Sequence, residues 1–145
     1  MKIVIELNSA LAEAIHHTQV IVPPFRTIDQ GFPSIQTWTE PKKFPIGTDG
    51  APGSKQMSAP IPLGPEQIKA LEAALDTVQI SPSRSADNID GVMDGWTTVM
   101  SIESFRTKVQ MRWFCDPPKQ WKGIDTLVDA INRILIDLQR AAESK

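Results

Sequence analysis

The sequence predicts an α+β fold, in which a small, mainly antiparallel sheet packs against two amphipathic helices. Two observations carry this prediction. Within Asp94–Trp121, apolar and polar side chains alternate, and a period of two is typical of a half-buried strand. Over Ile68–Val78 and Ile124–Leu138, apolar side chains recur at helical spacing. The second half of the chain is therefore predicted to run from a helix through two strands to a second helix, and the fold prediction rests on this order.

The alternating stretch predicts a β-hairpin. Its strands are Trp96–Ile102 and Phe105–Phe114, joined by the short polar link Glu103-Ser104. Asp94-Gly95 is a turn signal that opens the first strand. Pro117-Pro118 follows the second strand, and proline cannot donate a hydrogen bond to a central ladder. Turn-forming residues therefore precede and follow the predicted hairpin.

The two helices are predicted at Pro65–Val78 and Ile124–Arg140. Proline suits the first helical position, and acidic side chains favour the first turn because of the helix dipole. The second helix carries so much apolar surface on one side that we expect it to lie across the inner face of the hairpin. The tail, residues 141–145, is expected to fray.

The N-terminal region allows two interpretations. Lys2–Leu7 is rich in β-branched residues and predicts a strand, whereas the spacing of Val4, Leu7 and Leu11 also fits a helix. We reconcile them as a strand to Leu7 followed by a short helix capped by Ser9. A second strand is then predicted at Gln19–Val22.

Residues 23–64 form a Pro/Gly-rich segment, which the sequence predicts to be an irregular insertion. It holds eight of the 12 prolines and five of the 8 glycines, a density that opposes long helices and central strands. One short strand is predicted at Ser34–Thr39. Long irregular loops are either functional or disordered, and the sequence leaves both readings open.

The bulk properties describe an ordinary single domain spanning residues 1–145. Its hydrophobic content of 41% and charged content of 22% are typical of globular proteins. A net charge of −2 gives no reason to expect nucleic acid as a partner. Cys115 is the only cysteine, which excludes an internal disulfide and suits a reducing compartment. No stretch has the length and apolarity of a membrane span, so we expect no membrane association and a cytoplasmic location.

The sequence offers no assembled catalytic, metal or cofactor site. His16 and His17 are adjacent and diverge on a helix or a strand, so they do not chelate. The acidic loop Asp87–Gly95 resembles a calcium loop, but Thr97 occupies the place of the bidentate glutamate. Cys115 lies between aromatic residues and an aspartate, which disfavours a reactive thiolate. We therefore predict no catalytic residues, no metal and no cofactor.

The candidate partner-binding residues are basic or aromatic. Arg106, Lys108 and Arg112 share one side of the second hairpin strand and could be a solvated outer face or a contact for an acidic protein. Trp38 and Phe44 lie in the Pro/Gly-rich segment, where large aromatics either pin loops to the core or anchor an interface.

An ordered series of motifs resembles the C-terminal half of small bacterial proteins of the toxin-immunity type. The series comprises Asp94-Gly95-Trp96, Arg112-Trp113, Pro117-Pro118 with Trp121, and the final amphipathic helix. The resemblance spans Ile61–Leu138 and leaves residues 23–60 uncovered. It implies a protein that neutralises a cognate toxin by direct binding, and it brings no catalytic residues with it.

Two other functional classes stay open. A small enzyme or ligand-binding protein would use scattered groups such as Asp90, Asp94 or His17, in a pocket between hairpin and insertion. A structural or assembly subunit would instead self-associate through an exposed apolar patch.

Overall fold

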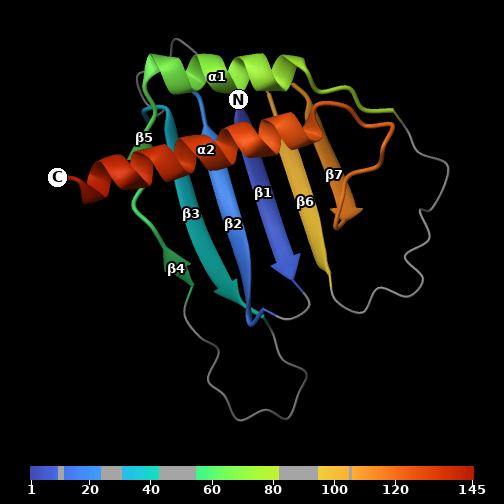
Figure 1. The fold of residues 1–145 in the computed structure, drawn as a ribbon, viewed down its shortest axis with the longest axis horizontal. Helices are drawn as coiled ribbons and strands as arrows, with labels where there is room; N and C mark the ends of the chain where they lie inside the picture. The colour runs from blue at the N-terminus through green and yellow to red at the C-terminus, as the bar shows by residue number, and fades with distance from the viewer. Residues whose placement is uncertain (10–11, 24–30, 43–54, 82–94, 105) are drawn as a thin grey trace, which may run out of the picture.

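A seven-stranded antiparallel sheet forms one layer of the protein, and two helices form the other (Figure 1). The computed structural model describes residues 1–9, 12–23, 31–42, 55–81, 95–104 and 106–145. The strands are β1 (Lys2–Ser9), β2 (Ala14–Ile21), β3 (Ser34–Pro41), β4 (Gln56–Met57), β5 (Ile61–Pro62), β6 (Trp96–Glu103) and β7 (Lys108–Phe114). The helices are α1 (Pro65–Asp76) and α2 (Ile124–Glu143). The predicted α+β class and its antiparallel sheet with two packed helices are confirmed.

β1 lies in the middle of the sheet, whose order is β4-β3-β2-β1-β6-β7, with β5 also paired to β3. On one side of β1 lie β2 and β3, which follow it directly in the chain. On the other side lie β6 and β7, which follow α1. Each neighbouring pair is antiparallel, so one row of residues can be followed across all the long strands.

The predicted helix after Ser9 is wrong. β1 extends to Ser9, and Ala14–Ile21 is a strand rather than a helix followed by the short strand Gln19–Val22. β2 pairs with β1 on one side and with β3 on the other. Both backbone edges of β2 therefore meet sheet partners, and this outweighs the helical spacing of a few apolar residues.

The prediction that residues 23–64 are an irregular insertion is also wrong in part. β3 is longer than predicted and lies inside the sheet, between β2 and the short strands β4 and β5. β3 tolerates this place because its only proline, Pro41, is its last residue. Pro62 lies in β5, which is too short to need a full ladder.

The hairpin is confirmed, with a shift in its second strand. β7 begins at Lys108 rather than Phe105, and the Ser104 N–H donates to the Thr107 carbonyl at 2.8 Å across the turn. Arg106 therefore precedes β7 instead of lying in it. Phe105 is outside the described residues.

Both helices are close to their predicted bounds. α1 begins at Pro65 and ends at Asp76, and the Gln67 side chain accepts a hydrogen bond from the Gly64 N–H at 3.0 Å. α2 continues to Glu143, so the expected fraying from residue 141 is wrong.

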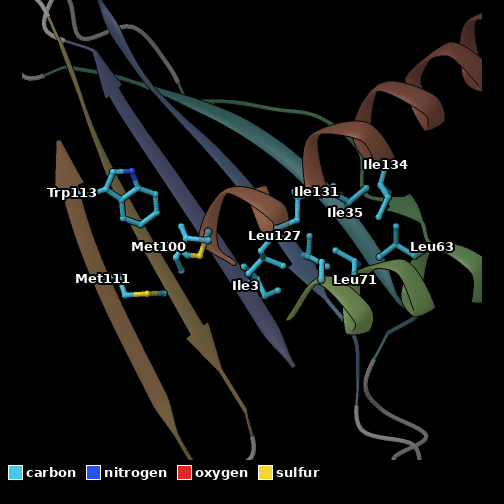
Figure 2. Close-up of a cluster of buried hydrophobic side chains, with 13 residues drawn as sticks. Ile3, Ile35, Leu63, Leu71, Met100, Met111, Trp113, Leu127, Ile131 and Ile134 are labelled. Atoms are coloured by element: carbon cyan, nitrogen blue, oxygen red, sulfur yellow. The ribbon is translucent and has the colours of Figure 1, made fainter. Parts of the chain in front are cut away.

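The core lies between the sheet and the two helices (Figure 2). Ile3, Ile35 and Met100 reach it from three strands, and Leu71 and Leu127 reach it from α1 and α2. All of the buried strand side chains in this cluster lie on one face of the sheet, which we call the helix face. The opposite side of the sheet is the distal face. The alternate residues of the same strands lie on this face.

Candidate functional site

The distal face carries a row of side chains that runs across five strands. The register aligns Trp38 with His17, His17 with Glu6, Glu6 with Val99, and Val99 with Arg112. Adjacent strands lie about 4.8 Å apart, so the two ends of this row are about 19 Å apart. We call these five residues the distal row. It brings together two predicted partner-binding residues, Trp38 and Arg112, that are far apart in the sequence.

At one end of the distal row, Trp38 contacts one cationic and one potentially cationic side chain. Its ring stacks on His17 with centroids 4.8 Å apart and an interplanar angle of 5°. The Lys55 Nζ atom lies 5.1 Å from the centroid of the same ring, at a distance typical of a cation–π contact. Trp38 lies in β3, within the predicted strand Ser34–Thr39, and is half-buried.

Glu40 joins this cluster from the same strand. Its Oε2 atom lies 3.5 Å from His17 Nε2, and its Oε1 atom lies 3.5 Å from Lys55 Nζ. The Glu40–Lys55 pair is solvent-exposed and contributes only about 0–1 kcal/mol. His17 Nε2 and Trp38 Nε1 are buried without a hydrogen-bond partner in the described chain, and such unpaired buried groups usually have a functional or structural explanation.

At the other end of the distal row lie the predicted basic residues. Lys108 and Arg112 are exposed on β7, the last strand of the described sheet. Lys108 faces Glu103 of β6 across the hairpin, whereas Arg112 faces the apolar Val99. Arg106 is exposed before β7 and does not share their strand. Phe44 lies outside the described residues.

The helix face contains a cavity of about 420 Å³ beside α2. Below α2 in Figure 1, the strands continue without a helix in front of them. Side chains of four strands, β1, β2, β6 and β7, form the floor: Ile5, Leu7, His16, Trp96, Thr98 and Trp113. The α2 residues Asp125, Val128 and Asn132 form one wall, and Cys115, Asp116 and Pro117 close one end. We call this the α2 cavity.

Two other cavities border the sheet. One of about 510 Å³ shares His16 and Thr18 with the α2 cavity and continues toward β4, past Leu135 of α2. The other, of about 640 Å³, lies at the opposite end of β1 and β2 and includes the exposed Phe32. Its lining includes Lys2 and Glu103, which carry opposite charges.

The sequence reasoning missed the α2 cavity because its residues come from four strands, one turn and one helix. Asp125, Val128 and Asn132 follow one another at helical spacing beside the apolar stripe of α2, and this was the one available signal. The sequence analysis related acidic side chains of the first helical turn only to the helix dipole, and Asp125 is one of them. His16 and His17 do lie on opposite faces of β2, as expected for a strand.

Of the groups named for an alternative enzyme or ligand site, Asp90, Asp94 and His17, only His17 lies within the described residues. Asp90 and Asp94 lie outside the described residues, as does most of the calcium-like loop. Within the described ranges, no group of three or more His, Cys, Asp or Glu side chains could hold a metal ion. Trp121 packs against the core beside Trp113.

Comparisons with protein-family models, with curated proteins and with solved structures find no match. The resemblance to immunity proteins therefore stays a prediction from sequence motifs. Among the helices of the described chain, none is long and apolar enough to cross a membrane.

Proposed function

We propose that the chain is a non-enzymatic protein-binding module, an immunity protein that neutralises a cognate toxin by direct contact through its distal face. The observation that supports this most is the distal row, which aligns Trp38 and Arg112 on a sheet face opposite both helices. Trp and Arg are the residue types that most often dominate binding energy at interfaces. A lone cysteine is consistent with an encounter in the cytoplasm.

The Trp38 end of the face is suited to an anchor because its geometry is fixed before binding. The indole is stacked on His17 and lies beside Lys55, so little side-chain freedom is lost when a partner contacts it. At the other end, Lys108 and Arg112 are exposed on one edge strand and would face acidic groups of the partner.

Capture of the partner is the first experiment. Tagged protein is used to retrieve bound chains from lysate of the source organism, and mass spectrometry identifies them. We expect one stoichiometric partner that is toxic when expressed alone and harmless when co-expressed. A captured chain without toxicity would contradict toxin neutralisation, and concentration-dependent self-association alone would favour the structural-subunit alternative.

Two substitutions then locate the interface. Trp38→Ala and Arg112→Glu should each weaken binding of that partner by more than about 1 kcal/mol, the usual loss at an anchor. Ile136→Ala and Arg133→Glu, both at exposed positions of α2, are controls and should leave affinity unchanged. Isothermal titration calorimetry on folded variants measures the difference. Equal affinities for all four variants would place the interface elsewhere.

A further inference from the structure

We propose that the α2 cavity binds an organic cation, either an alkylammonium or an alkylguanidinium group. This site lies on the helix face and does not depend on the proposed function of the distal face. Its described lining residues include two aspartates, Asp116 and Asp125, one histidine, His16, and no lysine or arginine. Neither carboxylate forms a salt bridge with a described residue, His16 included. A concave, partly apolar site whose permanently charged side chains are carboxylates concentrates cationic ligands when the histidine is neutral.

Aromatic rings supply the second element of cation recognition. Trp96 and Trp113 both line the α2 cavity. Trp113 is buried and its ring meets Trp121 edge to face, with centroids 6.4 Å apart and an interplanar angle of 88°, so its orientation is fixed. Trp96 is 45% exposed and remains available to a ligand. Indole faces are the best aromatic partners for ammonium and guanidinium groups.

The hydroxyl of a buried threonine that lines the α2 cavity gives an independent indication of a ligand. Thr98 lines the α2 cavity and is only 5% exposed. In the described part of the chain its side chain makes no hydrogen bond. A hydroxyl oxygen accepts hydrogen bonds, and so does the side-chain carbonyl of Asn132 on the opposite wall. Both acceptors suit the N–H donors of a cation, which carries several donors and no acceptor.

The remaining lining defines the rest of the ligand. Leu7, Val128 and Pro117 present apolar surface, which accommodates a short alkyl chain rather than a second charge. A volume of about 420 Å³ lies at the small end of the range for small-molecule sites. The favoured occupant is therefore a small organic cation with an alkyl tail.

The experiment is an NMR titration of the full-length, ¹⁵N-labelled protein with n-butylguanidinium. The indole N–H signals of its four tryptophans report on binding. We expect saturable shifts for Trp96 and Trp113 and none for Trp38, which lies on the distal face. Butylurea has the same shape without the charge and should bind about tenfold more weakly, as expected for loss of a charge-assisted hydrogen bond. Equal binding of butylurea, or no saturable shift with butylguanidinium, would overturn the proposal.

Variants assign the binding to this cavity. Asp116→Asn should weaken butylguanidinium binding about tenfold, and Thr98→Val about threefold. Asp116 is exposed, so its variant tests the site even if the Thr98 variant fails to fold. Asp129→Asn, on α2 but outside the cavity lining, is the matched control. Equal affinities for Asp116→Asn and Asp129→Asn would contradict the proposed site.

A blocked Gly-Arg-Gly peptide distinguishes the source of the cation. Tighter binding of the peptide than of butylguanidinium supports a cation site occupied by an arginine of another chain. Tighter binding of butylguanidinium supports a cation site for a free small molecule.

Discussion

At the scale of single residues, Cys115 connects backbone geometry to the α2 cavity. Among the described residues, it is the only non-glycine residue with a positive φ, at 55°. Its N–H donates to the Trp96 carbonyl at 2.8 Å, which fixes the end of the hairpin. From this bend the chain places Asp116 and Pro117 at the cavity rim. A left-handed residue here therefore directs a carboxylate toward the proposed ligand.

Substitutions at Cys115 should separate backbone strain from the loss of the thiol. Cys115→Val should lower the free energy of unfolding by about 1–2 kcal/mol, because a β-branched residue resists the left-handed region. Cys115→Asn should change it by no more than about 0.5 kcal/mol, because asparagine tolerates that region. Urea unfolding of both variants provides the comparison. A valine variant as stable as the asparagine variant would mean that the bend relaxes at no cost.

At the scale of elements, the junction between α1 and α2 is held by backbone contacts. Gln79 and Lys122 exchange two backbone hydrogen bonds, of 2.8 and 2.9 Å, just before α2 begins. Gly123 follows with φ 77° and is the N-cap of α2. A Cβ atom on Gly123 would overlap the backbone carbonyl of Thr77. The start of α2, and with it the position of Asp125, thus depends on a residue without a side chain.

Gly123→Ala should destabilise the protein by about 2 kcal/mol or more, since alanine meets both the unfavourable φ and the Thr77 carbonyl. Gly31→Ala is a suitable control because a Cβ atom there meets nothing within 4 Å. Its effect should stay within about 0.5 kcal/mol. Thermal unfolding of the two variants tests the difference. Similar melting temperatures would show that the junction can move to accept a side chain.

At the scale of the whole molecule, one core joins the two halves of the chain. Ile35 comes from the N-terminal strands and Met100 from the later hairpin, and both lie in the cluster that contains Leu127 of α2. α2 thus packs on strands from both sides of the central β1 (Figure 2). The distal row also crosses from one half to the other. The two halves should therefore unfold together.

Leu127→Ala should lower the free energy of unfolding by about 2–5 kcal/mol, since Leu127 is fully buried and its truncation leaves a cavity. Ile136→Ala, on the exposed side of the same helix, should cost no more than about 0.5 kcal/mol. Hydrogen exchange should show that Leu127→Ala reduces protection in β3 and β7 to a similar extent. Loss of protection in only one of these strands would contradict a shared core.

The sequence by itself determined the elements whose residues repeat with a single clear period. Alternation placed the β6–β7 hairpin, and helical spacing placed α1 and α2 and their buried sides. It also predicted that Arg106, Lys108 and Arg112 share one side of the second hairpin strand, which is confirmed for Lys108 and Arg112 but not for Arg106. These properties are local, because the period of two or 3.6 already states which side of an element is apolar.

Only the tertiary structure decided which strands pair and what their pairing brings together. Ala14–Ile21 became a strand because β1 and β3 satisfy its backbone on both sides, although its apolar spacing left a helix open. Trp38 and Arg112 entered one row through four successive strand pairings. Asp125, Thr98 and Trp96 met at one cavity through the packing of α2 on the sheet. Such neighbours are set by register and packing between distant segments, which a local pattern does not encode.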